Sequence, residues 1–420
     1  MLAMCIVYRV GGKVPVPGID ARALMSIMSG MSNTLFGLYD MFVGGSFSKM
    51  TIFALGIMPY ISASIILQLL GSVVPYFQRL QKEGEEGRKK ITQLTRYGTV
   101  LLSMAQSYGI AMWLQNAEGS GGMPIVSQPG VRFIFLTMVT ITAGTIFLMW
   151  LGEQLTENGI GNGISMIIFF GIVDGFPFAL KSEFSEFMAG NRSIFTEVFL
   201  LTLMVANTAF IVLLTQGQRR IRVQYPKKVI GRKIYGGQST YIPLRVNTAG
   251  VIPIIFAQAI MFVPQTIAQL TPLEFFKNTI APYFNYTSVV YWIFYGLLIM
   301  FFTYFYTAIV FNPVDLADNL KKYGAVVPQK PPGKKTAEHI DRILTRITLP
   351  GAIALAFVAI MPYFIVKIFR VNYYYAQFFG GTGLLIVVGV ALDTLQQIET
   401  KMLERHYEGL LKGGKIRGRR

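Results

Sequence analysis

The residues with the clearest potential for function are apolar, and they lie around a proline. The uncharged segment Ile52–Leu70 has Pro59 near its middle, and Ile57 and Ile61 flank that proline four residues apart. Residues four apart share one face of a helix, and a proline inside a helix frees a carbonyl group and kinks the helix. Isoleucine side chains at mid-membrane suit a constriction that closes by excluding water.

The same pattern returns far along the chain. Thr248–Val263 repeats the Gly-x-x-Pro spacing with Pro253, and aligning the two prolines sets Ile61 against Ile255. Matching interrupted segments in two halves of a chain indicate an internal repeat with its functional site at the interface. Glycine and proline are also frequent in unrelated membrane helices, so this pattern alone leaves both interpretations open.

Reactive groups for other chemistries are sparse. The two histidines, His339 and His406, fall outside the apolar segments, and Cys5 is the only cysteine. The glycines of Gly161–Gly163 resemble a phosphate loop but lack its lysine. The sequence therefore predicts no metal site, no cofactor and no enzyme.

An ion-coupled transporter needs ionisable groups at mid-membrane. The charges near apolar segments instead fall at their predicted ends, as Glu153 and Asp393 do, and Asp174 is placed nearer the other surface. This class of protein stays open as the alternative to a channel.

Composition indicates a polytopic membrane protein. Of the 420 residues, 53% are hydrophobic and only 14% are charged, whereas about a quarter of a soluble domain is charged. We predict an all-α fold of ten transmembrane helices. An incomplete first helix starts at Leu2, and the others are predicted at Ile52–Leu70, Tyr97–Leu114, Phe133–Leu151, Gly163–Leu180, Phe195–Leu214, Thr248–Val263, Val289–Phe311, Ile347–Phe369 and Phe378–Leu395. The weaker segment Ala23–Met50 is predicted to be a short or re-entrant helix.

Basic residues predict the orientation. Four stretches, 79–96, 219–245, 321–346 and 401–420, hold 28 of the 38 Lys and Arg residues. The positive-inside rule places these stretches in the cytoplasm, and ten crossings put both termini there.

Two of these loops are longer than topology requires. In 216–247, the runs IRVQY and STYIPLRV flank GRKIYGG, which predicts a projection like a β-hairpin. In 312–347, a tip rich in Pro, Gly and Lys joins two short helical segments, the second capped by Thr336. A basic loop can also be a topology signal and nothing more.

Six long motifs occur along the chain: FALGIMPYISASIILQLL, QKEGEEGRKKITQLTRYG, FLMWLGEQLTENGIGNGIS, NTAGVIPIIFAQ, YTAIVFNPVDLADNLKKYGAVVP and GGTGLLIVVG. In sequence, order and loop length they resemble the SecY family (SecY/Sec61-alpha), the channel subunits of the Sec protein translocon. The resemblance implies a clamshell of two inverted five-helix halves around a central pore. It implies an N-terminal half at 1–180, a hinge loop at 181–194, a C-terminal half at 195–398 and a basic tail at 399–420.

The resemblance also implies four groups of functional residues. The apolar ring at the pore waist would be Ile57, Ile61, Ile168, Ile172, Ile255 and Ile386. The plug that closes the pore would be Ser32, Asn33, Thr34, Leu35, Phe36, Gly37, Leu38, Tyr39, Asp40, Met41, Phe42, Val43, Gly44 and Gly45. The lateral gate between helices two and seven would include Pro59, Ser62, Gln68, Pro253 and Gln258. The docking residues would be Arg219, Arg220, Arg222, Arg232, Lys233, Lys330, Lys334 and Lys335.

The function that the resemblance implies is translocation of unfolded secretory polypeptides, with release of hydrophobic segments sideways into the lipid. The implied partners are the small subunits SecE and SecG, the SecA motor ATPase or the ribosome, and polypeptides that carry a signal sequence. Ribosomal RNA would be contacted only through the ribosome. The implied location is the bacterial inner membrane, with the thylakoid membrane as the alternative.

Overall fold

The computed structural model describes the chain apart from residues 1, 21–22, 25–26, 28–34, 118–123, 191, 226, 231–232, 237–238, 271–287, 372 and 414–420. The chain divides into two compact units. The first unit comprises Met1–Ala189, Asn372–Tyr375 and Ile386–Arg420, and the second comprises Gly190–Val371 and Ala376–Leu385. The break after Ala189 falls inside the segment predicted as a hinge, whereas the residues from Ile386 onward group with the N-terminal residues.

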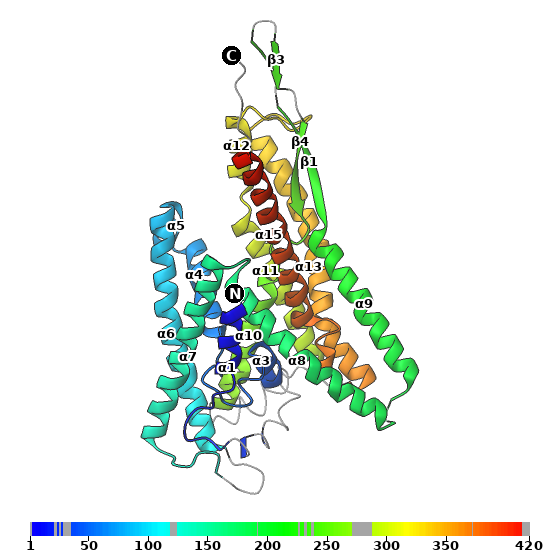
Figure 1. Ribbon diagram of the computed structural model, residues 1–420. Coiled ribbons are helices and arrows are strands. Elements are labelled where there is room, and N and C mark those ends of the chain that lie inside the picture. Colours follow the sequence, from blue (N-terminus) through cyan, green and yellow to red (C-terminus); the bar gives the residue numbers. More distant parts are fainter. Residues whose placement is uncertain are drawn as a thin grey trace. The chain divides into compact units, whose positions relative to one another are not determined.

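The first unit is helical (Figure 1). α6 packs against α4 on one side and α7 on another, α8 packs against α7, and the short α3 packs against α8. Its elements are α1 (Leu2–Gly11), α3 (Leu35–Phe42), α4 (Met58–Val73), α5 (Pro75–Lys82), α6 (Glu85–Asn116), α7 (Val131–Asn158), α8 (Gly163–Met188) and most of α15 (Gly381–Gly413).

The second unit combines helices with two strand pairs. α11 packs against α10 and α13, and α12 packs against α13. Its elements are α9 (Ile194–Gln216), β1 (Gln218–Gln224), β2 (Lys227–Ile230), β3 (Lys233–Gly236), β4 (Ser239–Arg245), α10 (Ile252–Leu270), α11 (Val289–Val310), α12 (Pro313–Lys322) and α13 (Lys334–Phe369), while α14 (Tyr373–Ala376) falls at the boundary with the first unit.

The helices are those of a multi-pass membrane protein. Within the described residues, six helical segments are long and apolar enough to cross a membrane, and the bent pair of α4 and α5 brings the number to seven. The six are Val131–Asn158, Gly163–Met188, Ile194–Gln216, Val289–Lys322, Lys334–Phe369 and Gly381–Glu404. Each of the ten predicted spans overlaps a helix. For α1, α6 and α10, the crossing itself remains a prediction.

The predicted kink at Pro59 is wrong, because α4 begins at Met58 and the proline occupies its first turn. Residues 52–57 form turns instead, and Gly56 has a φ of +56°, which an L side chain rarely adopts. Proline is well suited to the first helical turn, where its missing N–H would have no intrahelical partner.

The second Gly-x-x-Pro segment has the same local structure. Gly250 has a φ of +64°, α10 begins at Ile252, and Pro253 is its second residue. The amide of Ile61 donates to the carbonyl of Ile57, as the amide of Ile255 donates to Val251. The repeat that the spacing suggested therefore extends to backbone conformation.

Three other boundaries differ from the predictions. α8 continues to Met188, so the first eight residues of the predicted hinge loop 181–194 are helical. The helical segment after the 312–347 loop tip is continuous with the predicted span at Ile347, giving the single 36-residue helix α13. Thr336 does not cap this helix: Gly333 is the N-cap, and the Thr336 hydroxyl donates to the carbonyl of Pro331 at 2.8 Å.

Candidate pore and docking surfaces

The described part of the predicted plug is a short helix, α3, followed by a turn. The structure describes it from Leu35, and Ser32, Asn33 and Thr34 lie outside the described residues. The Asp40 side chain accepts a hydrogen bond from the Ser48 amide at 2.8 Å, and the Gly45 amide donates to the Asp40 carbonyl at 2.8 Å. These bonds hold the turn after α3 closed, so α3 ends in a compact loop.

Two segments of the first unit that carry predicted ring residues contact the predicted plug. The Tyr39 hydroxyl donates to the carbonyl of Leu55 at 2.8 Å, two residues before Ile57. A Cβ added at Gly56 would lie 3.0 Å from a methyl group of Val43. The plug therefore packs directly against the turn that leads into α4.

The other contact is with α8. A Cβ at Gly171 would lie 2.6 Å from the carbonyl oxygen of Phe42, and one at Gly44 would lie 3.1 Å from the Cα of Gly171. Such distances leave no room for a side chain, so glycine is required for this close backbone approach. Ile172 follows Gly171 directly, and Ile168 precedes it by three residues.

The structure places five of the six predicted ring residues in the first unit. Ile57, Ile168, Ile172 and Ile386 are buried there, and Ile61 is half-buried. Ile57 points toward α7, because a Cβ at Gly152 would lie 3.3 Å from its terminal methyl group. Ile255 is half-buried in the second unit. That all six form one ring stays a prediction.

The predicted gate residues lie on α4 and α10. On α4, Pro59 is buried, Ser62 is half-buried, and Gln68 donates to the Ser64 hydroxyl at 3.3 Å. On α10, Pro253 and Gln258 are buried. The two helices belong to different units, so their pairing also stays a prediction.

The loop Gly159–Gly163 serves as a helix start and a contact for α15. The Asn162 side chain accepts hydrogen bonds from the amides of Ile164 and Ser165, which caps α8. The Gly161 amide donates to Gln397 at 2.7 Å, and the Lys401 amino group donates to the carbonyl of Gly159 at 2.9 Å. The resemblance of this loop to a phosphate loop therefore reflects its role in starting α8 and contacting α15.

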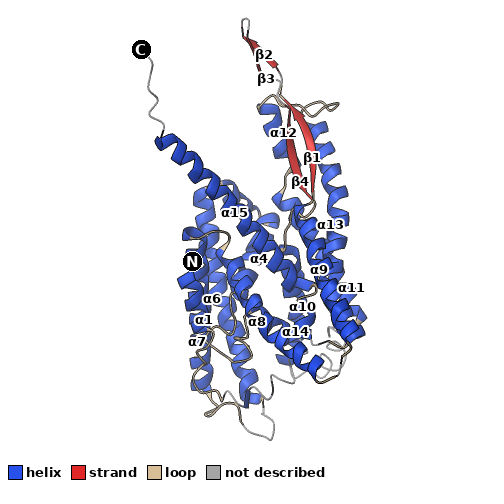
Figure 2. Cartoon of the chain, turned by 45° about the vertical axis from the view of Figure 1, so that its right-hand side comes forward, coloured by secondary structure: helices blue, strands red, loops and turns tan. Residues whose placement is uncertain are grey.

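The predicted hairpin-like projection is confirmed as a twisted ribbon (Figure 2). β1 pairs antiparallel with β4, with Ile221 opposite Ile242, and β2 pairs with β3 nearer the tip. Ile221 and Val223 are buried while Arg220 and Arg222 are exposed, as the two-residue period of a strand requires.

The two projecting loops form one body, which the sequence did not predict. The backbones of Gln224 and Val326 exchange two hydrogen bonds of 2.9 Å. A hydrophobic core joins the ribbon to α12, the following loop and the start of α13, and it consists of Ile221, Val223, Leu244, Leu320, Ala325, Val327 and Ile340. We call this body the docking platform.

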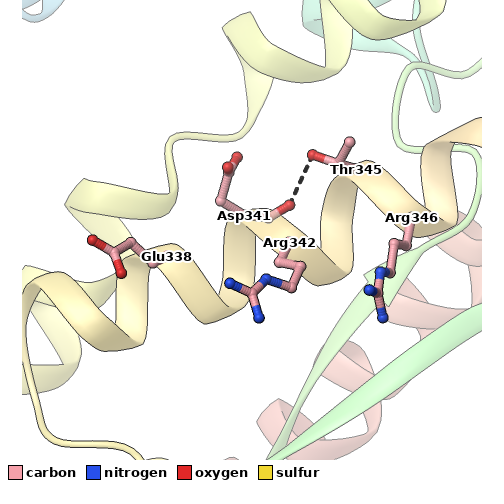
Figure 3. A pocket seen from close by; sticks show the side chains of 5 residues that line it. All are labelled: Glu338, Asp341, Arg342, Thr345 and Arg346. Atoms are coloured by element: carbon pink, nitrogen blue, oxygen red, sulfur yellow. Dashed lines mark hydrogen bonds between the residues drawn. The ribbon is translucent and has the colours of Figure 1, made fainter.

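The predicted docking residues distribute over this platform. Arg219, Arg220, Arg222, Lys330, Lys334 and Lys335 are exposed, and nothing is described of the side chains of Arg232 and Lys233. The prediction missed a further basic pair on α13, where Arg342 and Arg346 line a shallow cavity of about 450 Å³ with Glu338, Asp341 and Thr345 (Figure 3). The four-residue spacing that places both guanidinium groups on one helix face was visible in the sequence.

Comparisons with known proteins agree with this arrangement. The SecY family model matches residues 51–395. The protein translocase subunit SecY of Escherichia coli K12 is 46% identical over 421 residues, which cover 100% of this chain and 94% of the relative. That of Aquifex aeolicus is 43% identical over 412 residues, which cover 98% of this chain and 95% of the relative.

Solved structures share the fold. A protein-conducting channel superposes with a TM-score of 0.66 at 17% identity, covering 95% of this chain and 90% of that one. Sec61 in a canine ribosome–channel complex from the endoplasmic reticulum superposes with a TM-score of 0.61 at 17% identity, with the same coverage. From the family match and the identity over almost the whole length, the chain belongs to the SecY family.

Proposed function

We propose that the chain is the channel subunit of a protein translocase, which passes unfolded secretory polypeptides through a membrane and releases their hydrophobic segments sideways into the lipid. The observation that carries this proposal is the packing of α3. The predicted plug contacts the segment bearing Ile57 through the side chains of Tyr39 and Val43, and the segment bearing Ile172 through its own backbone, as expected of a closure seated against the ring. Membership of the SecY family supports the same function.

The proposed closure has two layers. The six ring isoleucines would form a dry constriction, where hydrated ions cannot enter without losing water. The plug would lie against that constriction on its outer side. The common local structure of α4 and α10 supports a lateral gate formed by these two helices, since both begin with the same turn after a glycine of positive φ.

The proposed partners bind at the docking platform. Its exposed arginines and lysines suit either ribosomal RNA phosphates or acidic patches of a motor such as SecA, and one solved structural relative is a ribosome–channel complex. SecE and SecG are proposed as the small membrane subunits. We place the assembly in a bacterial inner membrane, with both termini in the cytoplasm, because the similar relatives are bacterial and the basic stretches alternate.

The test reverses two charges on the exposed face of the ribbon. Arg220→Glu with Arg222→Glu should abolish binding of ribosomes or SecA to membrane vesicles at physiological salt, and with it translocation. The resting ion leak should be unchanged. The matched control, Arg132→Glu with Lys181→Glu, changes the same charge at exposed positions of the first unit and should bind normally. Normal binding and translocation by the platform variant would refute the docking role.

Salt dependence separates the two partners. If both arginines contact phosphates, Arg220→Ala with Arg222→Ala should lower the slope of log affinity for ribosomes against log salt by about 2. A protein motor carries no condensed counterions of the kind that nucleic-acid phosphates release, so its affinity should lack this slope. Binding of wild-type protein should weaken as salt rises in either case.

A further inference from the structure

One ion pair lies away from the basic loops. In the described part of the chain there are three ion pairs, and two of them, Lys90–Glu83 and Arg96–Glu153, involve the basic stretch 79–96. In the third, Arg9 of α1 donates to Asp174 of α8. This pair joins helices that are far apart in the sequence.

Asp174 lies near the middle of α8, and its partner Arg9 lies in the last turn of α1. α8 runs from Gly163 to Met188, 26 residues, so Asp174 is 11 residues from its start. At 1.5 Å per residue this is about 17 Å along the helix axis. An ionisable group on a membrane-spanning helix is costly, pairs with an opposite charge and commonly has a function.

The residues beside the pair hold the plug. Tyr8, the neighbour of Arg9, donates its hydroxyl hydrogen bond to the carbonyl of Val43 at 3.3 Å. Gly171, almost one turn before Asp174, is the glycine that the backbone of Phe42 approaches. The ion pair thus joins the two helices whose adjacent residues contact the end of the plug.

We propose that the Arg9–Asp174 pair is a latch that keeps α1 and α8 at the spacing the plug needs to seat. Arg9 and Asp174 are positioning residues, because they would act on the plug through Tyr8 and Gly171. The side chains of Arg9 and Asp174 keep 42% and 27% of their surface exposed within the chain, so the pair lies at the rim of the packing, where separation of the helices would break it. The inference rests on the proposed channel function.

The test compares resting closure with opening by substrate in purified channels in planar bilayers. Asp174→Asn removes the charge but keeps the shape, and it should raise the resting ion conductance about tenfold, within the range typical of coupled sites. Arg9→Gln should act alike. The exchanged pair Arg9→Asp with Asp174→Arg should restore closure, and Asp174→Glu should stay closed.

A second readout follows the plug itself. In a Cys5→Ser background, a cysteine at Met41, which is 1% exposed, should react slowly with an impermeant thiol reagent added outside. Asp174→Asn should speed that reaction about tenfold, while a control cysteine at the exposed Ser127 should react at one rate in all variants. An unchanged rate at Ser127 would show that Asp174→Asn does not simply loosen the whole fold.

Several results would overturn the latch. Wild-type conductance and labelling in Asp174→Asn would do so, as would failure of the exchanged pair to restore closure. A wild-type proton flux that Asp174→Asn abolishes would indicate a proton relay instead. If only the exchanged pair accumulated in membranes, the pair would be needed for folding and not for seating. If wild-type protein never conducted during translocation, the channel function itself would fail, independently of the latch.

Discussion

Replacing Ile340 with alanine should release the ribbon of β1 and β4 from the rest of the docking platform without disturbing the membrane helices. Ile340 is 0% exposed and belongs to a core of only seven buried residues. The substitution removes three carbons, which is about 2.4 kcal/mol of transfer free energy at about 0.8 kcal/mol per carbon. With the cavity term, the expected loss is about 3 kcal/mol, inside the measured range for such substitutions.

That loss is large for so small a core. A two-stranded ribbon is marginally stable without a surface to pack against, and here the surface is supplied by α12, the following loop and the start of α13. The fraction of time that the ribbon is detached should rise about 100-fold, since each 1.4 kcal/mol is a factor of ten. Partner binding should weaken as the fraction of molecules with an intact docking platform falls.

Limited trypsin digestion of inverted membrane vesicles measures this opening. Cleavage at Arg219, Arg220 and Arg222 should accelerate in Ile340→Ala, while the resting ion leak remains that of the wild type. Val314→Ala is the control, because Val314 lies on α12 with 56% of its surface exposed and should cost almost nothing. Cleavage of Ile340→Ala at the wild-type rate would show that the ribbon is held by something other than this core.

Three more outcomes are expected. Ile57→Asn with Ile61→Asn should raise the resting conductance in planar bilayers while insertion is normal, because amide groups admit water to an apolar constriction; unchanged conductance would mean that these side chains line no pore. Gly171→Ala should also raise the leak, because its Cβ would lie 2.6 Å from the Phe42 carbonyl, and a closed Gly171→Ala channel would disprove the close seating of the plug. In a Cys5→Ser background, a cysteine at Ser239 should react with impermeant reagents only from the cytoplasmic face and one at Ser127 only from outside, and the opposite labelling would invert the topology.

Apolar segments predicted the membrane helices well, but not where the helices end. The predicted span at Gly163 stopped at Leu180 because polar residues follow, yet α8 continues to Met188. Helical hydrogen bonding does not require apolar side chains, so a change in hydropathy marks a change of surroundings and not the end of a helix. The same reason explains why α13 extends from the platform into the apolar segment without a break.

At α4 and α10 the Gly-x-x-Pro pattern forms a turn followed by the start of a helix, and not the kink that the proline predicted. A proline can kink a helix or begin one, and both are compatible with the Gly-x-x-Pro spacing. What decides between them is the φ of the preceding glycine, +56° at Gly56 and +64° at Gly250. A positive φ two residues before the helix interrupts any helix that would run through it.

The union of the two basic loops could not be read from either loop alone. The runs IRVQY and STYIPLRV predicted a hairpin-like projection, but not the surface against which it packs. Gln224 and Val326 are about 100 residues apart, and nothing in their local pattern indicates that they pair. The available clue was physical: a ribbon with an apolar face needs a second surface, and the other long loop was the nearest candidate in the predicted topology.

The contacts of the predicted plug indicate what holds the channel closed at rest. Two side-chain hydrogen bonds join the plug region to its surroundings, from Tyr39 to Leu55 and from Tyr8 to Val43. Together they contribute about 1–3 kcal/mol, and burial of the side chains of Met41, Phe42 and Val43, which are 1%, 7% and 2% exposed, adds further stabilisation. Displacing the plug would therefore require binding free energy from an entering polypeptide or from a partner. The predicted isoleucine constriction, whose closure would depend on excluding water and not on the plug, would close around whatever chain replaces the plug, so the plug would be needed only to seal the channel at rest.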